Sequence, residues 1–164
     1  MKLLVPLLFI CSFTVQAGSV GALIEKCTPP SHWKVMKRLV QVESGGNPLA
    51  INVNAPGVQF PKPKNKYQAK QLLRELLSRG YSVDIGLAQI NSQHFKQGRD
   101  FASRGFKAED ALDPCINLKM GALLISEAYR RHNDNLVAAL SVYNTGNPEK
   151  GLENGYVEKY IPKK

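Results

Sequence analysis

The chain has 164 residues and a formal net charge of +9 at neutral pH, with no internal repeat and no low-complexity tract. This length fits one compact domain and leaves little chain for a second one. The positive charge predicts a polyanionic partner, for which nucleic acid, anionic lipid and cell wall are the candidates.

Residues 1–17 have the pattern of a secretory signal peptide, because Lys2 precedes a short apolar run and small residues lead up to Ala17. The apolar run is well short of the roughly 20 residues that a membrane-spanning helix needs, which argues against an uncleaved anchor. A lipoprotein would need a small residue before Cys11, and Ile10 stands there. We therefore expect cleavage after Ala17 and export to the periplasm.

The mature domain is expected to cover residues 18–164, with no membrane span once the leader is removed. Loss of Lys2 lowers the formal net charge from +9 to +8. Export separates the domain from intracellular nucleic acid, and the sequence has no zinc-ligand spacing and no nucleic-acid-binding motif. Peptidoglycan, whose peptides carry carboxylates, is then the expected anionic partner.

Two of the three cysteines, Cys27 and Cys115, belong to the mature domain. In an oxidising compartment such a pair usually forms a disulfide. Closing the long loop between Cys27 and Cys115 would stabilise the fold by roughly 4 to 5 kcal/mol on the chain-entropy model. A metal site is disfavoured because neither cysteine has a second Cys or a His at ligand spacing.

Apolar residues at helical spacing predict a first helix from about His32 to Glu43. The Gly-Gly-Asn-Pro sequence at 45–48 ends this helix, because glycines and proline favour a turn. Glu43 is thereby placed at the carboxyl end of a helix.

The segment between Asn47 and Lys66 predicts a small hairpin. Its apolar residues alternate in two short pieces, Ile51 with Val53 and Val58 with Phe60.

A second helix is predicted from Tyr67 to Arg79, where leucines recur at helical spacing and Gly80 supplies a carboxyl cap. From Tyr81 to Asn91 we expect an extended segment that becomes helical from about Leu87.

Asp113 and Pro114 predict the start of another helix, since aspartate caps a helix and proline is tolerated in its first turn. A shorter helix is expected from Asn135 to about Tyr143. Beyond Gly146 the chain is expected to fold back over the core.

Three short blocks stand out among these elements: Glu43-Ser44-Gly45-Gly46, Gly86-Leu87-Ala88-Gln89-Ile90-Asn91 and Ala139-Leu140-Ser141-Val142-Tyr143-Asn144-Thr145-Gly146. In this order they resemble the soluble lytic transglycosylase (SLT) family. Its pattern is a glutamate-serine at a helix end, a glycine-leucine-methionine-glutamine block, and an alanine-rich helix that ends in tyrosine-asparagine-x-glycine. Each block alone is weak, but the three in order are specific.

Residues 82–86, 113–118 and 154–157 are also similar to one small branch of that family, which accompanies type IV secretion and conjugation machinery. Transglycosylases of type III secretion and pilus systems are close as well. The chain departs from the family at Ala88, where methionine is usual, and more mildly at Val142. We expect Ala88 to loosen a contact with the sugar in the cleft.

The resemblance implies that Glu43 is the catalytic acid and base. Breaking a glycosidic bond requires an acid that protonates the leaving oxygen, and a solvated glutamate would be ionised at neutral pH. We expect apolar neighbours such as Val40 and Val42, and the negative end of the helix, to raise its pKa toward roughly 6. The alternative is an exposed helix-terminal glutamate.

The same resemblance implies that Gln89 and Asn91 line the saccharide cleft, that Tyr143 holds the acid through its hydroxyl, and that Asn144 contacts saccharide. Ser44 is expected to orient the acid beside the substrate. Structural alternatives stand beside these roles: a core aromatic for Tyr143, a helix stop for Asn144, and a backbone contact at the turn for Ser44.

Asp84 is the second carboxylate suggested by position. In the family none is required, because the N-acetyl group of the substrate is thought to support the reacting centre while the glutamate removes a proton from the C6 hydroxyl. We therefore expect Asp84 to be a turn or capping residue. No metal or organic cofactor is implied, and His32, His94 and His132 lack ligand spacing.

These observations predict a mostly helical α+β domain similar to lysozyme, with a small β-hairpin beside the cleft. The implied activity is cleavage of the bond between N-acetylmuramic acid and N-acetylglucosamine with formation of 1,6-anhydro ends, which would open the wall for a secretion or conjugation apparatus. The alternatives are a hydrolytic muramidase on the same fold, a non-catalytic wall-binding or assembly protein, and a nucleic-acid binder.

Overall fold

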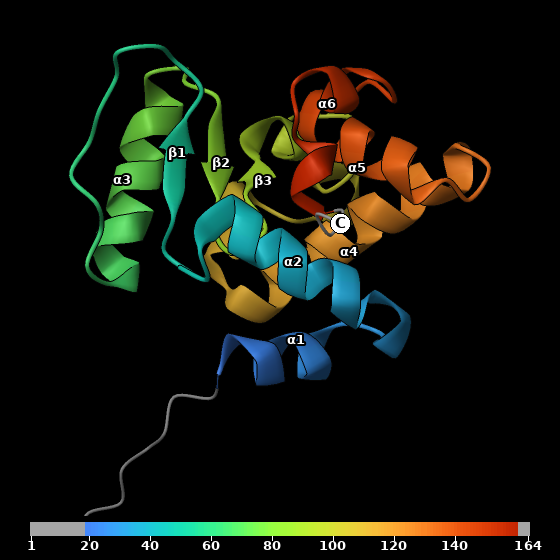
Figure 1. The fold of residues 1–164 in the computed structure, drawn as a ribbon. Coiled ribbons are helices and arrows are strands. Elements are labelled where there is room, and N and C mark those ends of the chain that lie inside the picture. The colour runs from blue at the N-terminus through green and yellow to red at the C-terminus, as the bar shows by residue number, and fades with distance from the viewer. Residues whose placement is uncertain (1–18, 161–164) are drawn as a thin grey trace, which may run out of the picture.

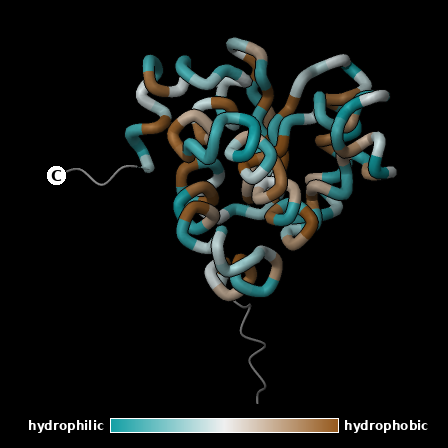
Figure 2. Tube along the Cα trace, turned by 90° about the vertical axis from the view of Figure 1, so that its right-hand side faces the viewer, coloured by the Kyte–Doolittle hydropathy of each residue, from teal (hydrophilic) through white to brown (hydrophobic). Residues whose placement is uncertain are grey.

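The computed structural model describes residues 19–160, so the predicted signal peptide at 1–17 lies outside the described part. The described chain is mostly helical with a small sheet (Figure 1), which confirms the predicted α+β class. Hydrophobic and hydrophilic stretches alternate along its helices (Figure 2), as expected where one helix face packs on a core. The helices are α1 (Val20–Cys27), α2 (Trp33–Ser44), α3 (Lys66–Ser78), α4 (Pro114–Arg131), α5 (Leu136–Thr145) and α6 (Lys150–Glu153), and the strands are β1 (Ile51–Val53), β2 (Val83–Ile85) and β3 (Ile90–Asn91).

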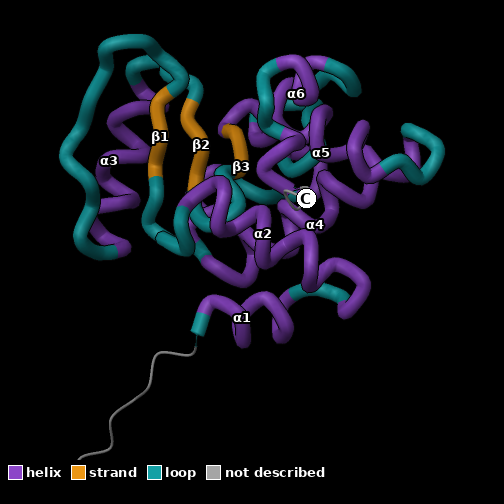
Figure 3. The backbone as a smooth tube through the Cα atoms, viewed as in Figure 1, coloured by secondary structure: helices purple, strands orange, loops and turns teal. Residues whose placement is uncertain are grey.

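The sheet is antiparallel in the order β1-β2-β3, and it lies between α3 and the other helices (Figure 3). Val83 and Ile85 of the central strand are fully buried. The register aligns Asp84 with Asn52 on one side and with Asn91 on the other. Because alternate residues of a strand face opposite ways, Asp84 faces away from these two buried side chains.

The predicted hairpin between residues 51–53 and 58–60 is wrong. β1 pairs with β2, and residues 58–60 form no strand. Phe60 packs edge-on against Tyr81, with ring centroids 6.3 Å apart. β1 pairs instead with β2, whose Val83 and Ile85 are fully buried, so a pairing distant in sequence replaces the local one.

The helix predicted from Leu87 is also wrong. Residues 86–89 form a turn that leads into β3. The φ angles of Gly86 and Gln89 are 75° and 50°, in the left-handed region that a right-handed helix cannot contain. The turn therefore joins β2 to β3 in a hairpin, and this hairpin is the one beside the pocket described below.

The remaining predicted helices are confirmed. The Asp113 side chain accepts bonds from the backbone N–H groups of Cys115 and Ile116, and Pro114 occupies the first turn of α4. Helix α2 ends at Gly45, whose φ is 59°. The chain beyond α5 returns over the core as predicted, since Tyr156 and Val157 are buried with Leu140.

Helix α1 was not predicted from the sequence, and the disulfide explains its place. Cys27, the last residue of α1, is bonded to Cys115 in the first turn of α4, with Cα atoms 5.4 Å apart. The predicted disulfide is thus confirmed, and it fastens α1 to α4.

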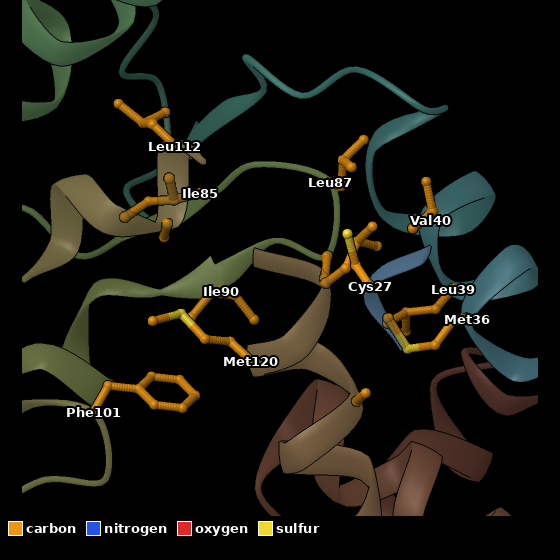
Figure 4. Packing of buried hydrophobic residues seen from close by; sticks show 14 of the residues in the cluster. Cys27, Met36, Leu39, Val40, Ile85, Leu87, Ile90, Phe101, Leu112 and Met120 are labelled. Carbon is orange, nitrogen blue, oxygen red and sulfur yellow. The ribbon is translucent and has the colours of Figure 1, made fainter. Parts of the chain in front are cut away.

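The main core joins all parts of the domain. Figure 4 shows Met36, Leu39 and Val40 of α2 in one packed cluster with Ile85, Leu87, Ile90 and Met120 from the hairpin and α4. These packed side chains hold the carboxyl end of α2 against the hairpin. Within residues 19–160, no helix has the length and apolar character needed to cross a membrane.

Candidate active site

A polar pocket of about 430 Å³ lies where the carboxyl end of α2 meets the β2–β3 hairpin and α5. Five of the six predicted catalytic and substrate-binding residues line it: Glu43, Gln89, Asn91, Tyr143 and Asn144. Residues that are distant in sequence are therefore brought together as the resemblance implied. The remaining lining residues are Asn54, Ser82, Asp84, Ile90, Gln93, His94 and Leu124.

Glu43 occupies the last turn of α2 and is half-buried. Burial is the main cause that raises the pKa of its carboxyl above the usual value, and the nearby Asp84 raises it further. A hydrogen bond from Tyr156 and the charge of Lys159 act in the opposite direction. The net rise favours a protonated carboxyl, which is the form that a general acid needs.

Tyr156, not Tyr143, holds the acid. The Tyr156 hydroxyl donates a hydrogen bond to Oε1 of Glu43, and the residue is only 4% exposed. The sequence reasoning placed Tyr156 in the tail similar to the secretion branch but gave it no role. The missed signal was an aromatic residue with a polar tip in a segment expected to fold back over the core.

Tyr143 supports the hairpin instead. Its hydroxyl donates to the carbonyl of Ala88 at 2.5 Å, and burial raises the pKa of this phenol well above its usual value. The role predicted for Tyr143 is wrong, because its hydroxyl hydrogen is used in the bond to Ala88, while Tyr156 donates to Glu43. Tyr143 still lines the pocket.

Asp84 is neither a turn nor a capping residue, contrary to the prediction. It lies in β2, lines the pocket with Glu43, and accepts a hydrogen bond from Nδ2 of Asn91 at 2.6 Å. Burial raises the pKa of Asp84, while hydrogen bonds from Asn91 and Asn54 and the charge of His94 lower it. Two carboxyls in one pocket disfavour double ionisation, which helps to keep Glu43 protonated.

Gln89 and Asn91 line the pocket, but both amides are engaged with the protein. Gln89 Oε1 accepts from Asn52 at 2.6 Å, and its Nε2 donates to the Gly86 carbonyl at 2.7 Å. Its φ of 50° is an uncommon conformation for a residue with a side chain, and such strain is often found at functional sites.

Asn144 is exposed at the rim, where its Oδ1 accepts from Asn154 at 3.0 Å. Ser44 does not line the pocket. Its hydroxyl donates to the carbonyls of Val40 and Leu87, so it joins the end of α2 to the hairpin. This is the backbone contact that the alternative interpretation of Ser44 described, and it bears on the acid only through position.

Ala88 is fully buried and is absent from the pocket lining, which agrees with the expected loss of a contact in the cleft. A Cβ placed on Gly121 of α4 would lie 2.8 Å from the Ala88 Cβ, which shows that Ala88 packs into the core against α4. The family's methionine position is therefore a packing position in this chain.

Asn117 is a supporting residue that the sequence reasoning missed. It is fully buried in α4, its Nδ2 donates to the carbonyls of Ile85 and Ala111, and its Oδ1 accepts from the Ala88 N–H at 2.7 Å. Gly86 is required beside it, because a Cβ there would lie 2.4 Å from Asn117 Nδ2. Its place in the Asp-Pro-Cys-Ile-Asn segment was the available signal.

His94 lines the pocket, and its Nδ1 lies 2.9 Å from the Asp100 carboxylate. His32 contacts the Ser126 hydroxyl at 2.5 Å outside the pocket. Within residues 19–160, no three His, Cys, Asp or Glu side chains are arranged to hold a metal ion. The carboxyls, amides and Tyr143 phenol in the lining offer acid–base and hydrogen-bonding chemistry.

Comparison with known proteins connects this arrangement to a family. A model described as Transglycosylase SLT domain matches residues 23–163. Protein virB1 of Agrobacterium fabrum is 35% identical over 140 residues, which are 82% of this chain and 54% of that protein. Protein virB1 of Rhizobium radiobacter is 34% identical over 151 residues, which are 88% of this chain and 60% of that protein.

Type IV secretion system protein virB1 of Brucella abortus is 33% identical over 153 residues, which are 85% of this chain and 61% of that protein. The chain thus spans between 54% and 61% of the length of these relatives. No solved structure matches the chain. Because the family model covers nearly the whole described domain and the relatives align with most of it, the chain belongs to the transglycosylase SLT domain family.

Proposed function

We propose that this protein is a peptidoglycan lytic transglycosylase with Glu43 as its catalytic acid and base. The observation that carries the proposal is a half-buried carboxyl with a raised pKa, held by a tyrosine hydroxyl in a polar pocket. Membership of the SLT family supports the same chemistry.

In the proposed reaction, Glu43 donates its proton to the glycosidic oxygen between N-acetylmuramic acid and N-acetylglucosamine. The carboxylate that results removes a proton from the C6 hydroxyl of the muramic acid residue, and this oxygen bonds to C1 to close a 1,6-anhydro ring. Glu43 is thereby reprotonated. The N-acetyl group of the substrate would support the positive charge at C1, as the family resemblance implies.

Asn144 at the rim and the polar groups of the hairpin are proposed to bind the saccharide. The amides of Gln89 and Asn91 are already engaged by Asn52, Gly86 and Asp84, so we propose that they present the pocket wall in a fixed geometry. Fixed groups cost little reorganisation when the substrate is bound.

Hydrolysis is the second candidate, because Asp84 lies in the same pocket as Glu43. In a hydrolase the second carboxylate acts as an ionised nucleophile or as a base for water. Membership of the SLT family favours the transglycosylase. Asp84 is proposed to act through its charge, which raises the pKa of Glu43 and so helps to keep that acid protonated.

We also propose that the protein acts in the periplasm and opens the wall for a type IV secretion or conjugation apparatus. Support comes from the relatives, which include a type IV secretion system protein. The chain is expected to reach the periplasm through the leader predicted at residues 1–17.

Digestion of purified peptidoglycan followed by mass spectrometry tests the reaction. A transglycosylase leaves anhydro ends, which are lighter by one water than the reducing ends left by a hydrolase. Soluble products with anhydro ends from the wild type, and none from Glu43→Gln, are expected. Products with reducing ends would overturn the transglycosylase proposal in favour of hydrolysis.

A further inference from the structure

A second and larger recess shares no lining residue with the polar pocket. It has a volume of about 1260 Å³ and is lined by α2, α4, α5 and the chain end at Val157–Tyr160. Figure 1 shows this chain end, in red, beside α2 and α5. We call this recess the basic groove. Its apolar walls are formed by Val35, Ile125, Tyr129, Leu136, Leu140 and Tyr160.

The charges around the basic groove are unbalanced. Lys34, Arg38, Arg130 and Lys159 line it and are exposed, whereas Glu158 is the one carboxylate among the lining residues that the structure describes. Within residues 19–160, none of these four cations forms an ion pair. Apolar walls with unpaired cations at the rim are complementary to a segment that carries both apolar and acidic side chains.

The basic groove is connected to the acid by two tyrosines. Tyr160 lines the groove, and its hydroxyl lies 2.6 Å from that of Tyr156. Either phenol could donate in the bond between them; because Tyr156 uses its single O–H hydrogen in the bond to Glu43, we assign Tyr160 as the donor. Donation from Tyr160 polarises Tyr156 and strengthens its bond to the acid.

We propose that the basic groove docks an acidic, apolar segment of a protein partner, and that an occupied groove slows turnover through Tyr160 and Tyr156. A carboxylate of the partner that accepts the Tyr160 hydrogen would take it from Tyr156 and weaken the hold on Glu43. The docking half stands on the groove alone, and the regulatory half rests on the proposed function.

Charge and shape favour a protein segment over the other occupants. Residues 161–164, Ile-Pro-Lys-Lys, add two lysines and do not complement a basic rim. A second copy of a chain with a net charge of +9 is disfavoured for the same reason. A bilayer surface engages protruding side chains, whereas these apolar side chains line a recess.

Binding is tested with a fluorescent synthetic peptide of about 15 residues that forms a helix with leucines on one face and glutamates on the other. Binding to the wild-type protein is expected. A matched peptide with lysines in place of glutamates is expected not to bind. Failure of the glutamate peptide to bind, or equal binding of both peptides, would overturn the docking proposal.

The chain offers matched control variants. Arg130→Glu and Leu136→Glu change residues that line the basic groove. Arg131→Glu and Leu152→Glu are the controls, because Arg131 and Leu152 do not line it. Leu136 and Leu152 are almost equally exposed, at 44% and 45%. The two groove variants are expected to weaken peptide binding about tenfold, and the two controls to leave it unchanged. Equal effects in both pairs would contradict a site in the groove.

Two further measurements separate other occupants. If the groove variants reduce binding to phosphatidylglycerol vesicles but not to the peptide, the occupant is a membrane and the proposal is wrong. If they change the sedimentation of the protein alone, the occupant is a second copy and the proposal is again wrong. No change in either measurement is expected.

Regulation is tested by turnover of purified peptidoglycan with saturating peptide. The wild type is expected to slow by at least about twofold, and Tyr160→Phe, which lacks the donating hydroxyl, is expected to bind the peptide without responding. A wild-type rate that does not change would overturn the regulatory half. A wild type without turnover would instead contradict the proposed function. The binding measurements would still decide whether the basic groove docks an acidic, apolar segment.

Discussion

Tyr156 donates a hydrogen bond to the carboxyl of Glu43 although 113 positions of the chain separate the two residues. The contact exists because the segment after α5 folds back over α2 and buries Tyr156 and Val157. The environment of the acid is therefore set by the end of the domain as much as by the helix that carries it.

Replacement of Tyr156 by Phe is expected to slow turnover by about tenfold, since it removes a hydrogen bond to the acid. That bond lowers the pKa of Glu43, so its loss raises the pKa further. The acid then stays protonated to a higher pH, and the alkaline limb of the pH–rate profile moves upward. Rates of muropeptide release across pH measure this, with the exposed Tyr67→Phe as control. An unmoved limb would contradict the assigned contact.

Asp84→Asn is expected to shift the same limb the other way. The charge of Asp84 raises the pKa of Glu43, so its removal lowers that pKa and moves the alkaline limb to lower pH. Turnover at acid pH should stay within about tenfold of the wild type, since no bond to the substrate is assigned to Asp84. A loss of about a thousandfold at every pH would indicate a nucleophile and favour hydrolysis.

Asn117→Ala is expected to destabilise the fold by about 3 kcal/mol, because it leaves a buried N–H and two buried carbonyls without their partner. Urea unfolding measures the change. The hairpin that carries Gln89 loses its anchor to α4, so turnover should fall in the protein that is still folded. A variant within about 1 kcal/mol of the wild type would show that the hairpin holds itself in place.

The Cys27–Cys115 bond is expected to contribute roughly 4 kcal/mol to the free energy of unfolding. A double Cys27→Ser and Cys115→Ser variant should lose this stability in urea unfolding without loss of turnover at low temperature. The wild type in a reducing agent is the matched comparison and should unfold like the variant. Identical unfolding of the oxidised wild type and the variant would mean that the bond adds no stability.

Local signals made much of this fold predictable. The apolar spacing and caps placed α2, α3 and α4 to within a few residues, because a helix start or stop depends on neighbours in sequence such as Asp113 and Gly45. The sheet was not predictable in the same way. β1 and β2 are three residues each and pair across the whole of α3, so no short turn signals the pairing.

The sequence predicted which residues line the site better than it predicted the contacts that those residues make. The family blocks brought Glu43, Gln89 and Asn144 to one pocket. They assigned the contact with the acid to Tyr143 and not to Tyr156, because tertiary packing, which the blocks do not describe, orients both side chains. The packing of the Ala88 side chain into the core could not be predicted for the same reason.

The catalytic role of Glu43 is tested by comparing wild-type protein with Glu43→Gln on purified peptidoglycan, with soluble products identified by mass spectrometry. We expect products that end in 1,6-anhydro-N-acetylmuramic acid from the wild type and a loss of at least about a hundredfold in Glu43→Gln, whose amide cannot deliver a proton. Undiminished release of anhydro products by Glu43→Gln would contradict the assignment of this carboxyl as the catalytic acid.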